Sequence, residues 1–123
     1  MPLSKTDIVD RHRGVIEMEE PLLRRLFLGF LSLHVLHRAE TSWVFGLQLM
    51  EQLSLRGQEV SAGTLYPLLH QLEAAGLLVM EARTNEGKVR KYYRTTARGQ
   101  SLMAAARQLA GNLLAGLQDE VTG

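Results

Sequence analysis

The sequence predicts a mainly α fold with a small β-hairpin and a long final helix. Residues 61–78 carry leucines at helical spacing, and residues 77–95 alternate around the turn residues 85–87. Leucines and alanines at steps of four and three run through residues 102–117. At 123 residues the chain is expected to form one domain with its own hydrophobic core.

Composition narrows the class of protein before any motif is considered. The chain has no cysteine, which excludes disulfides and thiolate metal sites and fits a reducing cytoplasm. Its longest apolar run, residues 26–36, is too short to span a bilayer, and the N-terminus lacks the order of a signal peptide. We therefore expect a cytoplasmic protein without a membrane segment. The net charge is only +1, so any attraction to nucleic acid must come from local clustering of cations.

Residues 1–20 are polar, and they are expected to form a short helix or an arm that orders only on a partner. The first long helix is predicted over residues 21–38, with Pro21 at its first position. Its apolar residues cover most of the circumference, so it must be central or be covered by a second subunit. His34 and His37 lie one turn apart without a third ligand, so no metal site is predicted.

A second helix is predicted over residues 41–57, with Thr41 or Ser42 as its cap and apolar residues at helical spacing. Gly46 falls inside it, which suggests close packing against another backbone. A tight turn over residues 58–60 leads into the next helix. Helix, short turn and helix together indicate a helix-turn-helix.

The third helix is predicted over residues 62–75, with Ser61 as its cap and Gly76 as its left-handed end. Leu65, Leu68, Leu69 and Leu72 form its buried face. Pro67 is tolerated because it lies close to the first turn. The small residues at the helix start would let the backbone N–H groups approach a phosphate closely.

The hairpin over residues 77–95 concentrates positive charge. Six of the fourteen Lys and Arg residues fall between Arg83 and Arg98, against one acidic residue, Glu86. Charges on a hairpin edge can also serve to prevent strand pairing. The excess of a single sign favours contact with phosphates.

The last helix is predicted over residues 97–123, with Thr96 as its cap. Its apolar seam is close to that of a coiled coil, and a helix of this length extends beyond a small domain. We interpret it as a dimerisation helix. The alternative is that it packs back on its own domain.

Several of these residues are characteristic in combination. The stretch SAGTLYPLLHQLEAAGLL, followed by RKYYRTTARG, closely resembles the PadR family of bacterial transcriptional regulators. The resemblance implies a winged helix-turn-helix, a homodimer built through the first and last helices, and repression of a double-stranded DNA operator. The single short final helix resembles the smaller subgroup, some of whose members bind flat aromatic or drug-like molecules. It therefore implies a small hydrophobic or aromatic effector.

The resulting hypothesis is a dimeric, sequence-specific DNA-binding repressor. Residues 21–96 would form the DNA-binding domain, with helix 62–75 in the major groove and the wing, residues 77–95, on flanking phosphates. The candidate DNA contacts are Ser61, Gly63, Thr64, Tyr66, His70, Lys88, Arg90 and Lys91. The candidate dimer contacts are Leu26, Phe30, Leu102, Ala106, Leu109, Leu113 and Leu117.

Two other classes of function are alternatives to a DNA-binding repressor. A winged-helix module that binds another protein, without direct DNA contact, is the main alternative. An enzyme is disfavoured, because the spacing of the Ser and His residues indicates no catalytic triad. The sequence also shows no carboxylate pair and no phosphate-binding glycine loop. No catalytic residue, cofactor or metal is predicted.

Overall fold

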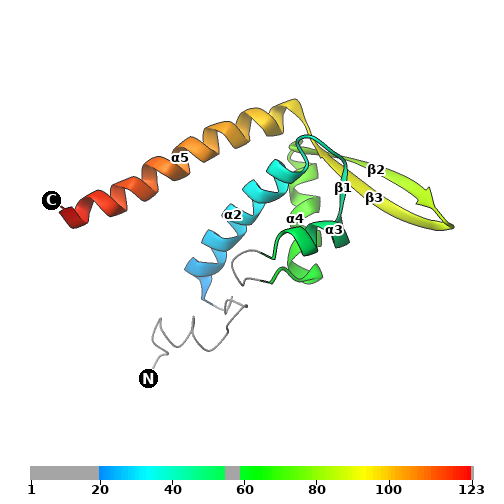
Figure 1. The fold of residues 1–123 in the computed structure, drawn as a ribbon, viewed down its shortest axis with the longest axis horizontal. Helices are drawn as coiled ribbons and strands as arrows, with labels where there is room; N and C mark the ends of the chain where they lie inside the picture. Colours follow the sequence, from blue (N-terminus) through cyan, green and yellow to red (C-terminus); the bar gives the residue numbers. More distant parts are fainter. Residues whose placement is uncertain (1–19, 55–58, 123) are drawn as a thin grey trace, which may run out of the picture.

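The computed structural model describes residues 20–54 and 59–122, and these residues form a helical body with a projecting hairpin (Figure 1). The helices are α2 (Pro21–Arg38), α3 (Gly46–Gln52), α4 (Ala62–Ala74) and α5 (Ala97–Thr122). The strands are β1 (Val44–Phe45), β2 (Leu78–Asn85) and β3 (Lys88–Thr95). The mainly α fold with a hairpin and a C-terminal helix is confirmed. The prediction for residues 1–19 lies outside the described residues.

The three strands form an antiparallel sheet in the order β1-β3-β2. Asn85 pairs with Lys88, so Glu86 and Gly87 alone form the turn, and both have positive φ. A two-residue turn of this kind matches the right-handed twist of the flanking strands, which explains why their pairing continues without a break up to Asn85 and Lys88. The hairpin was predicted, but the third strand was not.

The prediction of a second helix over residues 41–57 is wrong at its start. Val44 and Phe45 form strand β1, where they pair with Tyr93 and Tyr92 of β3. Helix α3 begins only at Gly46, and the N–H group of Phe45 donates to Oε1 of Gln48 at 3.3 Å. The prediction is also wrong at its end, because α3 stops at Gln52 with Leu53 as its C-cap, before the expected end at residues 56–57. The first five residues of the expected helix, 41–45, are therefore not helical, and the last two of them pair with a distant strand instead.

The core lies where α2, α4 and the sheet meet. Val35 of α2, Leu65 and Leu69 of α4 and Tyr93 of β3 are almost completely buried. One side of α2 remains uncovered, since Leu22, Leu26 and Phe30 are 45–62% exposed. The prediction that α2 is buried nearly all round therefore does not hold within a single chain.

The ends of the elements follow the expected local chemistry in most places. Glu20 caps α2 by accepting from the N–H group of Leu22 at 2.6 Å. Gly76 has φ +78°, and the N–H group of Leu77 donates to the carbonyl of Leu72, which is a Schellman end to α4. The hydroxyl of Thr96 accepts from the N–H group of Gly99 at 3.0 Å, as predicted for the start of α5.

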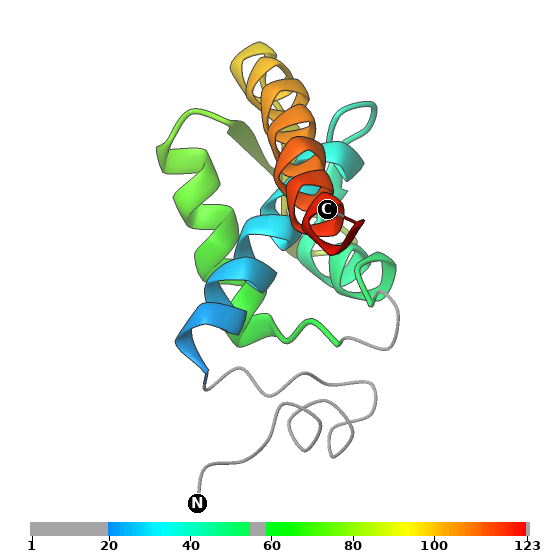
Figure 2. The ribbon, with the colours of Figure 1, turned by 90° about the vertical axis from the view of Figure 1, so that its left-hand side faces the viewer.

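Helix α5 leaves the sheet and runs past α2 to the C-terminus, as Figure 2 shows from its far end. Near its start it packs on the core through buried Met103, but Leu109, Leu113 and Leu117 are 57–72% exposed. Within the described parts of the chain, none of the helices combines the length and apolarity needed to cross a bilayer.

Candidate nucleic-acid interface

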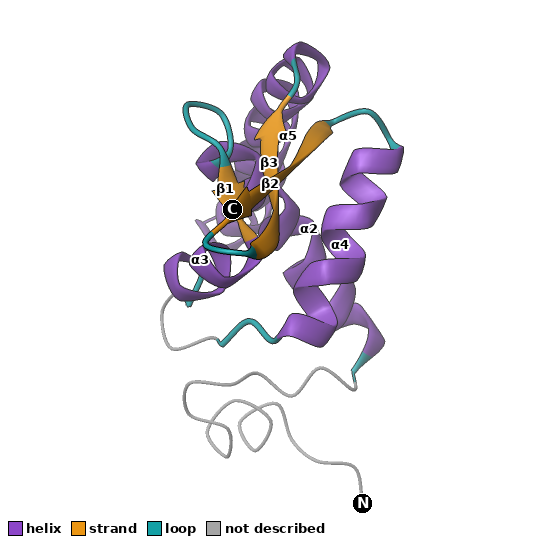
Figure 3. Cartoon of the chain, turned by 90° about the vertical axis from the view of Figure 1, so that its right-hand side faces the viewer, coloured by secondary structure: helices purple, strands orange, loops and turns teal. Residues whose placement is uncertain are grey.

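Helix α4 has one buried and one free side. Its four leucines face the core, whereas Gly63, Tyr66 and His70 are exposed and Thr64 is half-buried. The helix follows α3 and lies beside the hairpin, as seen along the hairpin in Figure 3. The side of α4 that carries Gly63, Tyr66 and His70 is thus open to solvent.

The start of α4 differs from the prediction in one detail. Ser61 occupies the cap position, but its side chain does not cap the helix. Instead its hydroxyl donates to Oγ1 of Thr64 at 3.2 Å. The N–H group of Thr64 donates to the carbonyl of Ser61 at 3.1 Å, so the N–H groups of Ala62 and Gly63 are those of the first turn that stay available to an anion at the helix end.

The ring of Tyr66 in α4 packs against the first residue of α3, Gly46. A Cβ atom built on Gly46 would lie 2.5 Å from Oη and 2.6 Å from Cε1 of Tyr66. Only glycine leaves room for this ring at the start of α3. The close packing expected at Gly46 is present, but its partner is a side chain rather than another backbone.

The wing carries its cations in two distinct settings. Lys88, Arg90 and Lys91 are all exposed near the tip of the hairpin. The guanidinium carbon of Arg90 lies 4.5 Å from the centroid of the Phe45 ring, in cation–π geometry. The two lysines have no such partner among the described residues, so they are the freest cations of the tip.

A notch of about 420 Å³ joins α3, α4 and the wing. Its wall includes Tyr66 and His70 of α4 together with Arg90 and Lys91 of β3. Four of the eight predicted DNA contacts therefore meet around one hollow. Ser61, Gly63, Thr64 and Lys88 do not line it.

A second, apolar groove of about 460 Å³ runs between α2 and α5. Six of the seven predicted dimer contacts line it, and Leu102 does not. The sequence reasoning missed further lining residues, and a small or apolar side chain was the available signal for all of them except Arg25. They are Arg25, Gly29, Leu33, Ala110 and Leu114.

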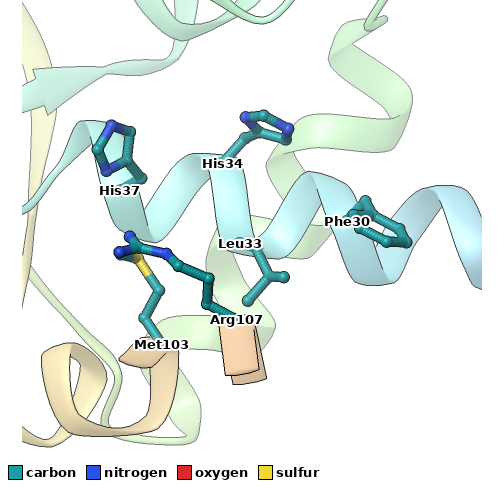
Figure 4. A pocket seen from close by; sticks show the side chains of 6 residues that line it. All are labelled: Phe30, Leu33, His34, His37, Met103 and Arg107. Carbon is teal, nitrogen blue, oxygen red and sulfur yellow. The ribbon is translucent and has the colours of Figure 1, made fainter. Parts of the chain in front are cut away.

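The groove continues into a more polar pocket of about 410 Å³ (Figure 4). Met103 and Arg107 reach from α5 toward α2, where His34 and His37 also line the pocket. Burial, followed by the nearby charges of Arg38 and His37, lowers the pKa of His34. The described residues contain no group of three His, Cys, Asp or Glu side chains that could hold a metal ion.

Comparison with known proteins gives a consistent picture. Residues 33–105 match the model of the transcriptional regulator PadR-like family. The chain is 46% identical over 98 residues to transcriptional regulator Rv3488 of Mycobacterium tuberculosis, covering 76% of this chain and 92% of that protein.

Solved structures show the same fold. A PadR family transcriptional regulator from Eggerthella lenta superposes with a TM-score of 0.73 at 32% identity, covering 81% of this chain and 88% of that one. A Streptococcus transcriptional regulator gives a TM-score of 0.67 at 26% identity, covering 82% and 97%. The chain thus shares its overall fold with these relatives over about four fifths of its length.

Proposed function

The chain belongs to the PadR-like family of transcriptional regulators, and from this premise we propose that it is a homodimeric repressor that binds operator DNA directly. Regulators of this family bind DNA and typically dimerise, and they are not enzymes. Each subunit would lay α4 in a major groove and rest its wing on the flanking phosphates. Two-fold symmetry then gives half-sites about 34–36 Å apart, which is one turn of DNA.

The observation that carries this proposal is the position of the positive charge. A chain with a net charge of +1 places six of its fourteen Lys and Arg residues in and next to the wing. The wing tip is exposed and projects away from the helices (Figure 1), and Arg90 and Lys91 share a notch with Tyr66 and His70 on the free side of α4. Phosphate contacts contribute most of the salt-dependent affinity of such proteins, whereas base contacts set the sequence.

The apolar groove between α2 and α5 supports the dimer. Leu109, Leu113 and Leu117 are more than half exposed, and they would face water in a single chain. Leu26 and Phe30 lie opposite them on α2. A second copy would bury two such surfaces at once, and contiguous exposed apolar surface of this kind marks an interaction site.

We place the hydrophobic or aromatic effector implied by the family resemblance in this same groove. Such an effector changes DNA affinity only if it binds one spacing of the two α4 helices better than another. The groove is the place where it could do so, because in the proposed dimer its two walls, α2 and α5, would lie at the contact between subunits.

The wing is tested by the salt dependence of affinity for a duplex that contains the operator. The double variant Lys88→Ala with Lys91→Ala removes two contacts per subunit, or four per dimer. The slope of log affinity against log salt should then become shallower by about 3.6, at about 0.9 per phosphate contact. Arg24→Ala with Arg38→Ala removes the same charge from exposed positions on α2 and should leave the slope unchanged. Wild-type protein that binds no duplex at low salt would refute direct DNA binding and favour a protein partner.

The dimer is tested separately by light scattering after size-exclusion chromatography. Leu109→Glu with Leu113→Glu puts two charges in the apolar groove and should convert the dimer to monomers. Gln108→Glu adds a charge to an exposed position of α5 that does not line the groove, and it should leave the dimer intact. A monomeric wild-type protein at micromolar concentration would contradict the proposed assembly.

A further inference from the structure

The outer face of the wing carries a stack of aromatic rings and guanidinium groups. The guanidinium carbon of Arg83 lies 5.1 Å from the ring centroid of Trp43 and 4.7 Å from that of Tyr92. Its Nε–H group donates to Oε1 of Glu81 at 3.1 Å. Arg83 is therefore held by three neighbours, although its side chain is 42% exposed.

This contact spans the full width of the sheet. Arg83 belongs to β2 and Tyr92 to the central strand β3, whereas Trp43 immediately precedes β1. A second clamp lies beside it, because Arg90 of β3 covers the ring of Phe45 in β1. The rings of Phe45 and Tyr92 meet edge to face, with centroids 5.4 Å apart. Side chains thus connect the three strands in addition to their backbone hydrogen bonds.

The projecting part of the wing has little other support. Residues 81–91 are all exposed. Apart from the notch beside α3 and α4, the stacks of Arg83 on Trp43 and of Arg90 on Phe45 are the contacts that hold this part of the hairpin to the described residues outside it. Arg83 and Arg90 are directly opposite in the register, and like charges in that position repel. The aromatic rings beneath them offset this repulsion.

The stack also connects the wing to the helix-turn-helix. Phe45 directly precedes Gly46, the first residue of α3, and the ring of Tyr66 from α4 packs on Gly46. A wing that pivots about its base would break the contacts of Arg83 with Trp43 and of Arg90 with Phe45. These contacts therefore oppose changes in the angle between the wing and α4.

We propose that Trp43 and Arg83 are positioning residues for DNA binding, which hold the wing at the angle where Lys88 and Lys91 reach phosphates. Arg83 is on this account a structural cation and not a phosphate contact. The inference rests on the proposed DNA-binding function. Trp43 lies outside the wing, and it would affect DNA affinity indirectly, by holding Arg83 in place.

The test compares Trp43→Leu, Trp43→Phe and Arg83→Lys with the wild-type protein, by salt-dependent binding to the same operator duplex. Trp43→Leu keeps an apolar side chain but removes the aromatic face. Arg83→Lys keeps the charge but removes the planar group that stacks. Each should weaken binding by about 3- to 30-fold per subunit, which corresponds to one cation–π contact. Each should also make the salt slope shallower by about 1.8, the equivalent of one phosphate contact per subunit.

Three further results are expected if the stack acts as proposed. Trp43→Phe should restore most of the affinity, and Trp43→Leu combined with Arg83→Lys should be no worse than either single change. Arg83→Lys should shift the fluorescence emission of Trp43, the only tryptophan of the chain, in the absence of DNA. Arg24→Lys, an exposed position on α2, is the matched control and should change none of these quantities.

The outcomes separate this inference from the proposed function. If wild-type protein binds no duplex, direct DNA binding fails. If wild-type protein binds with a steep slope and Arg83→Lys retains both affinity and slope, the positioning role is overturned and Arg83 is at most a point charge. If Arg83→Lys weakens binding but Trp43→Leu does not, Arg83 contacts DNA through its own planar group and the inference is again overturned. If Trp43→Leu does not fold, the affinity and salt slope of Arg83→Lys still test the positioning role.

Discussion

Gly46 offers the sharpest test of how α3 and α4 fit together. In Gly46→Ala the new Cβ atom would lie 2.5 Å from Oη of Tyr66, about 0.9 Å short of an ordinary contact at 3.4 Å. Overpacking costs about 1–3 kcal/mol, and the lower end applies here, because the half-exposed ring of Tyr66 can swing outward. Removing a glycine from the unfolded chain offsets about 0.4–1 kcal/mol of that cost. We therefore expect a loss of less than about 1 kcal/mol in stability.

The larger effect of Gly46→Ala should appear in DNA binding. The displaced ring belongs to the proposed interface, so affinity should fall although the fold is nearly as stable. Gly99→Ala provides the contrast, because its Cβ atom would meet the backbone oxygen of Leu77 and Cγ2 of Thr95, which cannot swing away. It should cost about 3 kcal/mol, a fall in melting temperature of about 10 °C.

Thermal unfolding followed by circular dichroism, at one fixed protein concentration, measures both variants. Gly111→Ala is the matched control, since its Cβ atom meets nothing within 4 Å, and it should raise stability by about 0.8–1 kcal/mol. Tyr66→Ala removes the ring that the new Cβ atom at position 46 would meet. In that background Gly46→Ala should cause no loss of stability. An equal penalty with and without the Tyr66 ring would show that the α3–α4 packing argued here is wrong.

Three further outcomes follow from local features and can be measured by chemical denaturation. Gly76→Ala should destabilise the protein by about 1–2 kcal/mol, because an alanine at φ +78° is strained, and Gly76→Asn should cost less. Glu86→Asn should stabilise the hairpin, because Glu86 has φ 52° and asparagine tolerates that conformation better in a two-residue turn. The pKa of His34 is lowered in the folded chain, so as the pH falls the unfolded chain binds a proton at this residue before the folded chain does. The free energy of unfolding should therefore be at its full value above about pH 6.5 and decrease below it. His34→Gln should reduce that decrease.

The parts of the fold that the sequence predicted are those with local causes. Pro21 marks the start of α2, Gly76 the end of α4 and Thr96 the start of α5, because each acts on its own turn of helix. The hairpin turn at Glu86 and Gly87 is local in the same sense. The free side of α4 also followed from the spacing of its leucines, because that spacing identifies the buried side.

The parts that escaped prediction depend on residues far away in the sequence. Trp43, Val44 and Phe45 fit a helical period, yet Val44 and Phe45 pair with Tyr93 and Tyr92, almost fifty residues later. Arg83 and Arg90 looked equivalent to the other wing cations, because nothing in the sequence indicates that aromatic rings lie beneath them. Thr95 is buried, with its hydroxyl donating to the carbonyl of Leu36 at 2.7 Å, a partner 59 residues earlier in the sequence.

These non-local contacts converge on the short segment between α2 and α3. The backbone N–H group of Thr95 donates to Ala39 at the end of α2, so β3 is fixed to that helix. Trp43 and Phe45 then hold the wing, and Gly46 receives Tyr66 of α4. Because α2, the wing and α4 are all anchored within eight residues of chain, we infer that they move together. A ligand or partner in the groove between α2 and α5 would therefore act on DNA by rotating whole subunits rather than by bending one of them.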